Sequence, residues 1–183
     1  MRVGKEYVAW RTKKIDKDRW VYVWADGIYS GLRSDDVKLC VLVVIGVNER
    51  GEKHFLAIED GSRESTQSWR EVLLVLKNRG METPQLAVGD GAMGFWSALE
   101  VYPHTRQQRC WMHKTSNVLN RVPKSIQPKV KQGLHDIWQA PTKQAAAEAF
   151  DSFEEMFKNK YPKAVECLQK DRTELMAFYD FPA

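Results

Sequence analysis

The first part of the chain alternates between apolar and polar residues with the period of β-strands. From residue 20 to residue 26, bulky aromatic side chains alternate with smaller apolar ones, which predicts a strand with an acid at its end. Residues 38–47 and 54–58 predict two further strands, joined by the turn Asn48–Gly51. We therefore expect an antiparallel meander. One face of its first strand carries Trp20, Tyr22, Trp24 and Asp26.

A helix is expected after the meander. Apolar residues at helical spacing run from Trp69 to Leu76. Ser65 and Ser68 precede them as possible N-caps, and Gly80 follows as a C-terminal cap. The segment 65–80 thus has a start signal, an apolar face and a stop signal.

A second acid ends the next predicted strand, residues 85–90. A helix is expected to begin near Ala92 and to stop at Pro103, and residues 105–111 predict a fifth strand. Both acids, Asp26 and Asp90, are followed by glycine. The face of the fourth strand that ends on its acid carries Leu86, Val88 and Asp90.

The rest of the chain has a helical pattern, and Pro162 begins a last helix that is expected to reach about Tyr179. Three strands, a helix, a strand, a helix and a strand, followed by helices, predict a mixed α/β sheet with a helical extension. Since no flexible linker interrupts the chain, we expect one domain over 1–183, with an α/β core at about 1–113 and a helical region at 114–183. The helical region has two apolar stripes, Ile126, Val130, Leu134, Ile137 and Trp138, and Ala146, Ala149, Phe150, Phe153 and Phe157.

Composition agrees with a single compact domain without disulfides. The chain has 183 residues, of which 43% are hydrophobic. Its three cysteines are an odd number, and no secretory signal pattern is present, which favours a reducing cytoplasm. The longest apolar run, residues 39–47, is too short to cross a bilayer, so no membrane association is expected.

The distribution of charge suggests a polyanionic partner. The net charge of the chain is +4, but residues 101–135 hold seven positive charges and no carboxylate, which leaves −3 for the remainder. Such a segment is typical of a surface that follows phosphates. A solvated helical face with lysines and arginines placed for solubility is an equally good interpretation. The cations are Arg106, Arg109, Lys114, Arg121, Lys124, Lys129 and Lys131.

The two strand-end acids are candidate metal ligands. Carboxylates at adjacent strand ends suit Mg²⁺, which is commonly held by one or two carboxylates plus substrate phosphate, and they indicate two-metal phosphoryl transfer. The alternative is that each Asp-Gly pair only makes a turn. For Asp90, a nearby helix N-terminus would favour a bound phosphate, whereas the alternative makes Asp90 the N-cap of that helix.

Two other features carry weaker signals. Cys110 and His113 form Cys-x-x-His, half of the ligand set of a structural zinc site, and a packing or hydrogen-bonding role is the stronger interpretation. Trp96 and Trp111 fit a hydrophobic core, although aromatic residues near basic ones also stack on unpaired bases.

Taken together, these motifs resemble the Mutator-type family of bacterial DNA transposases. The resemblance runs through nearly the whole chain, and the matching segments follow one another in the same order as in the family. The matching segments are Ala25–Tyr29, Val44–Val47, Glu64–Ser65 with Trp69, Gly89–Ala92 with Gly94–Trp96, Gln108–Lys114, Pro123–Ser125 and Lys160–Ala164.

The resemblance implies an RNase H-like fold and a catalytic triad of two Asp and one Glu. Asp26 looks like the first catalytic and metal-binding Asp and Asp90 like the second, with Mg²⁺ or Mn²⁺ as cofactor and zinc not expected. Cys110 and His113 match the family's Cys-x-x-His signature. The implied partners are DNA, both element ends and target, and other copies of the protein in a homo-oligomer. The implied DNA contacts are the seven cations above and Trp96.

The resemblance also implies a limit. The family's catalytic Glu lies on a helix further on, and its end-recognition region lies before Met1, so we expect a catalytic-domain segment with little activity by itself. Two alternatives stay open. One is a metal-dependent nuclease that completes its site from an internal acid, and the other is an inactive DNA-binding or dimerising remnant. The internal acids are Glu148, Glu154, Glu155, Glu166 and Glu174.

Overall fold

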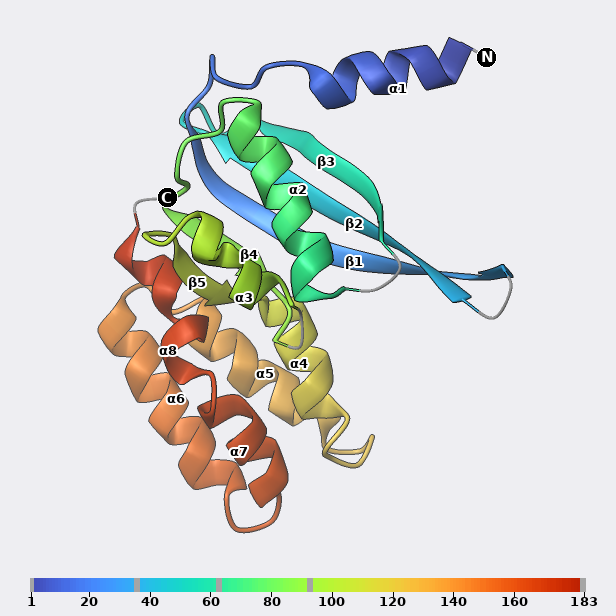
Figure 1. Cartoon of the computed structure of the whole chain (residues 1–183). Helices are drawn as coiled ribbons and strands as arrows, with labels where there is room; N and C mark the ends of the chain where they lie inside the picture. Colours follow the sequence, from blue (N-terminus) through green and yellow to red (C-terminus); the bar gives the residue numbers. More distant parts are fainter. Residues whose placement is uncertain (1, 35–36, 62–63, 92–93, 182–183) are drawn as a thin grey trace. The chain divides into compact units, whose positions relative to one another are not determined.

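The chain folds into two compact units, Met1–Gln107 and Gln108–Ala183. The computed structural model describes residues 2–34, 37–61, 64–91 and 94–181, without the side chains of residues 2, 3 and 30–39 (Figure 1). Each unit has its own hydrophobic core. Whether the two form one domain, as the sequence suggests, stays a prediction.

A mixed five-stranded sheet has the order β3-β2-β1-β4-β5. The first three strands form an antiparallel meander, and β4 joins the other side of β1 in parallel. This is the RNase H-like arrangement expected from the sequence. The strands are β1 (Trp20–Ser34), β2 (Val37–Asn48), β3 (Lys53–Gly61), β4 (Leu86–Gly89) and β5 (Arg106–Arg109).

Helix α2 (Thr66–Asn78) packs on one face of this sheet (Figure 1). It begins where predicted, because the hydroxyl of Ser65 accepts a hydrogen bond from the Ser68 amide at 3.1 Å. It ends before Gly80, whose φ of +99° is a conformation that glycine adopts without strain. The buried face of α2 is Trp69, Val72, Leu73 and Leu76, as the helical spacing predicted.

The face of the first strand was predicted wrongly at one residue. Trp20 is 4% exposed and belongs to the core with Val23 and Ala25, whereas Trp24 on the opposite face is 37% exposed. The register between β1 and β2 shifts between Trp20 and Tyr22, so β1 has one extra residue there. Such a bulge moves the following side chains to the other face of the sheet.

Helix α1 (Arg2–Thr12) has no counterpart in the sequence prediction. It is held by contacts to the edge strand β3: the Tyr7 hydroxyl donates to the carbonyl of Ile58 at 2.6 Å, and Arg11 donates to the carboxylate of Glu59 at 2.6 Å. The helix is thus stabilised by tertiary contacts rather than by an apolar stripe of its own.

Buried Arg79 ties α1, α2 and β3 together. It is 6% exposed and lies just after α2. Its guanidinium donates to the backbone carbonyls of Leu56 at 2.5 Å, Lys13 at 2.8 Å and Trp10 at 3.3 Å. Three carbonyls from two segments, the end of α1 with the residue that follows it and β3, therefore depend on one side chain.

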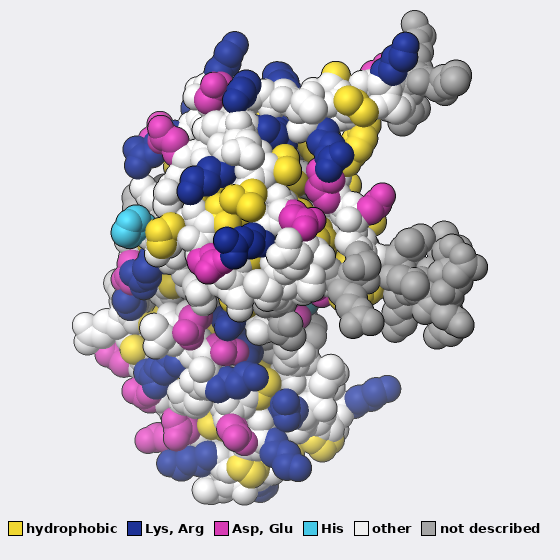
Figure 2. All heavy atoms as spheres, in the orientation of Figure 1, with side chains coloured by type: hydrophobic (Ala, Val, Ile, Leu, Met, Phe, Trp, Pro, Cys, Tyr) yellow, Lys and Arg dark blue, Asp and Glu magenta, His cyan; other side chains and the backbone are white. Residues whose placement is uncertain are grey.

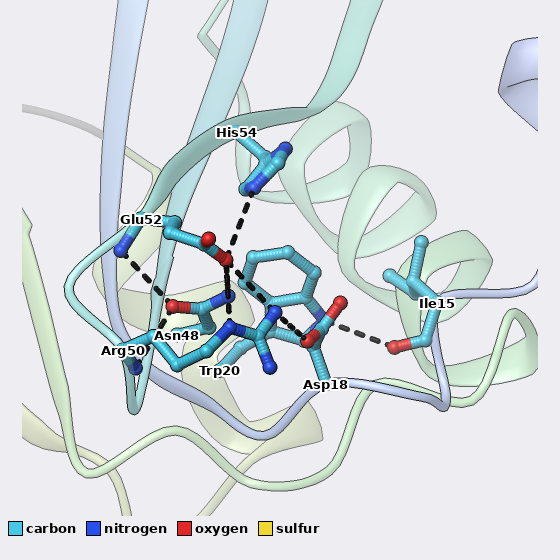
Figure 3. A network of polar contacts seen from close by, with 7 residues as sticks. All are labelled: Ile15, Asp18, Trp20, Asn48, Arg50, Glu52 and His54. Atoms are coloured by element: carbon cyan, nitrogen blue, oxygen red, sulfur yellow. Dashed lines mark hydrogen bonds and ion pairs between the residues drawn. The ribbon is translucent and has the colours of Figure 1, made fainter.

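The predicted turn between β2 and β3 is present and is braced by side chains (Figure 3). Asn48 Oδ1 accepts from the amides of Arg50 and Glu52, each at 3.0 Å, and Gly51 adopts a φ of +76°. The carboxylate of Glu52 accepts from Asn48 at 2.7 Å and from Arg50 at 2.9 Å, and Arg50 also donates to Asp18 at 2.6 Å.

The second unit is helical, as expected. Its core uses the interior of both predicted stripes, with Val130, Leu134 and Ile137 from one and Ala146, Phe150, Phe153 and Phe157 from the other. Its elements are α4 (Trp111–Leu119), α5 (Gln127–Trp138), α6 (Lys143–Phe157), α7 (Pro162–Gln169), α8 (Arg172–Leu175) and the 3₁₀ turn η2 (Ala177–Asp180).

The single last helix predicted from Pro162 to Tyr179 is wrong, because three short elements replace it. The break falls at Asp171, where the backbone leaves the helical conformation and the carboxylate turns to the ammonium of Lys114. That partner is 57 residues away in the sequence, so no local pattern could show the break. Among the described residues, no helix has the length and apolar character that a membrane span needs.

Candidate active site

Asp26 lies on the face of β1 that points away from α2. It follows Trp24 by two residues, and side chains two apart in a strand share a face. Trp24 pairs with Val88 of β4 in parallel register. The carboxylate of Asp26 is exposed. The acid predicted from the sequence is therefore exposed on the face of β1 opposite α2, and β1 lies next to β4 in the sheet.

Asp90 comes directly after β4 and follows Val88 by two residues. Asp26 lies two residues after Trp24, and Asp90 lies two residues after Val88. Because β1 and β4 are parallel, both acids are offset from the Trp24–Val88 pair in the same direction. Neighbouring strands lie about 4.8 Å apart, so the two side chains are neighbours on one face if the chain continues past β4 as a strand. The meeting of Asp26 and Asp90 is supported by register.

Two hydrogen bonds fix the backbone at Asp90. One carboxylate oxygen of Asp90 accepts from the amide of Gly91 at 2.5 Å, and the carbonyl of Asp90 accepts from the indole N–H of Trp96 at 2.5 Å. Trp96 is half-buried and packs against the core. The structure therefore gives Trp96 a supporting role at Asp90, and its predicted contact with DNA stays a prediction.

The helix expected near Ala92 differs from the prediction. Helix α3 spans only Phe95–Ala98, and its N-cap is Gly94. Residues 92 and 93 lie outside the described residues. Asp90 is consequently not the N-cap, and a four-residue helix that starts five residues later gives no support to a phosphate at its N-terminus.

The pair of carboxylates fits a hard divalent cation. Mg²⁺ and Mn²⁺ prefer oxygen ligands, and Mg²⁺ is commonly held by one or two carboxylates together with waters and substrate phosphates. Within the described residues, no group of three or more His, Cys, Asp and Glu side chains is arranged to hold a metal. The role of Asp26 and Asp90 as a pair of metal ligands stays a prediction, supported by the register of β1 and β4.

Cys110 and His113 lie at the start of α4 in the second unit. Cys110 is the N-cap residue, and its carbonyl accepts from the amide of Lys114 at 3.0 Å. His113 is half-buried, and its Nδ1 atom is buried without a hydrogen-bond partner in the part of the chain that the structure describes. The packing role suggested by the sequence for this motif stays a prediction.

Two of the seven predicted DNA-contacting cations have largely buried side chains in the second unit. The side chain of Lys114 is 5% exposed; its ammonium donates to the carbonyl of Cys167 at 2.9 Å and pairs with the carboxylate of Asp171. Arg109 lies 3.7 Å from the same carboxylate and is 16% exposed. The two cations therefore share the single carboxylate of Asp171, which gives them a structural role. The phosphate contacts predicted for them stay a prediction.

The same motif anchors the end of the helical unit. Gln108 donates to the carbonyl of Leu175 at 3.0 Å and accepts from the amide of Phe178 at 2.9 Å. The indole N–H of Trp111 also donates to the carbonyl of Leu175 at 3.0 Å. Together with Lys114, these residues attach α8 and η2 to the start of α4. Sequence analysis found the motif but not this role, because its partners are distant in the sequence.

The remaining five predicted cations are exposed. They lie on β5, in the loop between α4 and α5 and on α5. Figure 2 shows Lys and Arg side chains at the surface of the helical unit, mixed with Asp and Glu. The five exposed cations are Arg106, Arg121, Lys124, Lys129 and Lys131.

Comparisons with known proteins give one family. A family model described as "Transposase, Mutator family" matches residues 2–183. The transposase for insertion sequence element IST2 of Acidithiobacillus ferrooxidans is 50% identical over 182 residues, which are 98% of this chain and 62% of that protein. The transposase for insertion sequence element IS6120 of Mycolicibacterium smegmatis is 45% identical over 176 residues, which are 96% of this chain and 54% of that protein. The chain thus spans a little over half the length of these relatives.

Solved structures show a weaker similarity. The catalytic core domain of HTLV-2 integrase in complex with magnesium, in its dimeric form, is 14% identical, with a TM-score of 0.36 over 73% of this chain and 86% of that chain. At this level the similarity gives no information about function.

Proposed function

Because this chain belongs to the Mutator family of transposases, we propose that it supplies two catalytic carboxylates, Asp26 and Asp90, to a DNA transposase. The observation that carries the proposal is the register of β1 and β4, since each acid lies two residues beyond the Trp24–Val88 pair. If each Asp-Gly pair only made a turn, the two acids would not need to have the same offset from a pair of residues on adjacent parallel strands.

The proposed reaction is phosphoryl transfer: hydrolysis at an element end, followed by attack of the freed 3′-hydroxyl on target DNA. Bound Mg²⁺ or Mn²⁺ would supply charge neutralisation at the attacking and leaving oxygens. Asp26 and Asp90 would hold the cation through their carboxylates. Gly91 would orient Asp90 through its amide, and Trp96 would fix the backbone of Asp90 through the indole N–H.

The proposed partner is DNA, bound in a bacterial cytoplasm by a protein that works as a homo-oligomer. Four exposed cations, two in the loop between α4 and α5 and two on α5, are the candidates for phosphate contact in the second unit, with Arg106 on β5 as a fifth. Their support is exposure combined with the absence of acidic residues from positions 101–135 of the sequence. The four cations, here called the α5 basic group, are Arg121, Lys124, Lys129 and Lys131.

Strand cleavage and strand joining test the proposed catalytic role. In the whole transposase, Asp26→Asn and Asp90→Asn should each lower both reactions with Mg²⁺ or Mn²⁺ by about 10³-fold or more, while binding of element-end DNA is retained. Asp60→Asn is the matched control, because Asp60 is an exposed acid on β3 of the same sheet. Full activity of either Asp26→Asn or Asp90→Asn would overturn the proposal.

A further inference from the structure

Glu64 lies against Gly27, the residue that follows Asp26. A Cβ atom added at Gly27 would collide with the carboxylate of Glu64. Glycine at position 27 therefore leaves the space that this carboxylate occupies. Glu64 is half-buried and stands just before Ser65, the N-cap residue of α2, so its backbone is fixed at the start of a helix.

The carboxylate of Glu64 also interacts with the neighbouring part of the meander. Tyr29 pairs with Cys40 across β1 and β2. Burial, followed by the charge of Glu64 and a hydrogen bond to it, raises the pKa of Tyr29. Burial, followed by the charge of Glu64, raises the pKa of Cys40. Glu64 is therefore held against β1 by more than its contact with Gly27.

The backbone of Glu64 contacts the segment that follows Asp90. Its carbonyl accepts a hydrogen bond from the amide of Gly94 at 3.1 Å. A Cβ atom at Gly94 would approach this carbonyl to 2.8 Å and would collide with the backbone of Ser65 and Thr66. Gly94, like Gly27, leaves space that the segment around Glu64 fills.

These contacts connect the two proposed catalytic acids. Gly94 begins α3, which contains Trp96, and Trp96 donates to the carbonyl of Asp90. The connection thus runs from Asp26 through Gly27 to Glu64, and from Glu64 through α3 to Asp90. Each step is a hydrogen bond, a chain connection or a close packing contact.

We propose that Glu64 is a positioning residue that sets the spacing of Asp26 and Asp90. The inference rests on the proposed function of these two acids. Glu64 acts through the backbone, because successive side chains of a strand point to opposite faces, and Gly27 faces α2 while Asp26 faces away from it. Glu64 therefore supports β1 by packing against Gly27 beside the proposed metal site, and it is not a third ligand on the same face.

A double-mutant cycle on Mn²⁺ binding tests this inference. In the 183-residue chain, Gly27→Ala should weaken Mn²⁺ binding, followed by electron paramagnetic resonance, by about ten-fold, because the new methyl group displaces Glu64. In a Glu64→Ala background, where the collision is gone, Gly27→Ala should change binding by less than about two-fold. An equal effect of Gly27→Ala in both backgrounds would overturn the inference. Gly4→Ala is the matched control, since a Cβ there meets no atom within 4 Å.

Substitution of Glu64 alone gives a second test that does not depend on a glycine. Glu64→Gln keeps the size and hydrogen-bonding capacity of the side chain and should bind Mn²⁺ within about two-fold of the unchanged chain, whereas Glu64→Ala should bind about ten-fold more weakly. If Glu64→Gln and Glu64→Ala weaken Mn²⁺ binding equally, the charge of Glu64 matters rather than its packing against Gly27, and the inference is overturned. In the whole transposase, Glu64→Ala should lower kcat by about 10- to 100-fold and leave KM for DNA nearly unchanged.

Failure of the proposed function gives a different result. If Asp26→Asn and Asp90→Asn leave Mn²⁺ binding unchanged, the metal site itself is wrong, and the positioning role falls with it. If these two variants weaken binding but the cycle between Gly27 and Glu64 is additive, only the positioning role is overturned. Near-ultraviolet circular dichroism of each variant confirms that the comparison is between folded proteins.

Discussion

Asp26 lies two residues beyond Trp24 in β1, and Asp90 lies two residues beyond Val88, the residue of β4 with which Trp24 pairs in parallel. The two acids are 64 residues apart in the sequence, and the parallel pairing of β1 with β4 supports the prediction that they meet. Asp26 is on the face of β1 opposite α2. This relationship joins the fold to the proposed chemistry.

The first prediction concerns stability of the sheet unit. Arg79→Ala should lower the free energy of unfolding by about 3 kcal/mol, because it removes charge-assisted hydrogen bonds to three backbone carbonyls from a buried site. Arg70→Ala, within α2, is the control. Arg70 and its partner Glu100 have side chains that are 50% and 57% exposed, so the loss should stay below about 1 kcal/mol. Urea unfolding measures both, and equal losses would contradict the role of Arg79.

The second prediction separates structure from DNA contact in the basic segment. Lys114→Met should destabilise the helical unit by about 3 kcal/mol, because it leaves the carboxylate of Asp171 without its closest cation. Its effect on the salt dependence of DNA binding should be negligible. Lys143→Met, which breaks an exposed pair with Asp180, should cost less than about 1 kcal/mol. If Lys114→Met is as stable as the unchanged protein but its DNA binding depends less steeply on salt, Lys114 contacts DNA and its structural role is wrong.

The third prediction addresses the α5 basic group. Replacing Arg121, Lys124, Lys129 and Lys131 by Gln should lower the slope of log K against log salt by up to about 3 to 4, since each lost phosphate contact removes about 0.9. A matched variant removes the same charge from other exposed positions of the helical unit. If both variants lower the slope equally, the effect is one of net charge, and the α5 basic group serves solubility. The control replaces Lys158, Lys160, Lys163 and Lys170 by Gln.

The fourth prediction concerns pH and the turn between β2 and β3. Hydrogen bonds from Arg50 and Asn48 lower the pKa of Glu52 in the folded protein. Since the folded pKa is below the unfolded one, the stabilising effect of these contacts is present above the unfolded pKa and is lost as the pH falls through the folded pKa. A carboxyl titration by nuclear magnetic resonance should give a low midpoint for Glu52 that rises in Arg50→Ala. An unchanged midpoint would show that the contacts in Figure 3 do not persist in solution.

Sequence patterns predicted what depends on local periodicity. The alternation before Asp26 and Asp90 predicted a strand before each acid, and both strands are present. The N-cap at Ser65 and the end of α2 before Gly80 were also correct, because helix caps have local signals. These features need no knowledge of distant parts of the chain.

What the sequence did not predict depends on distant partners. The bulge at Trp20 comes from its pairing with β2, and the role of Lys114 comes from Asp171. The position of Glu64 against Gly27 joins two segments 37 residues apart, and the matching motif at Glu64–Ser65 gave no role for it. Charge and periodicity describe a residue and its neighbours, so they do not show which distant group will meet it.

Mn²⁺ binding by this chain tests the central claim most directly. Electron paramagnetic resonance of Mn²⁺ titrated with the 183-residue chain should show binding that Asp26→Asn and Asp90→Asn each weaken by about ten-fold or more, because each removes one of two carboxylate ligands. Asp60→Asn should leave it unchanged. Binding that persists at full strength when both Asp26 and Asp90 are replaced would contradict the account, since the strand register would then have brought together two acids that share no metal.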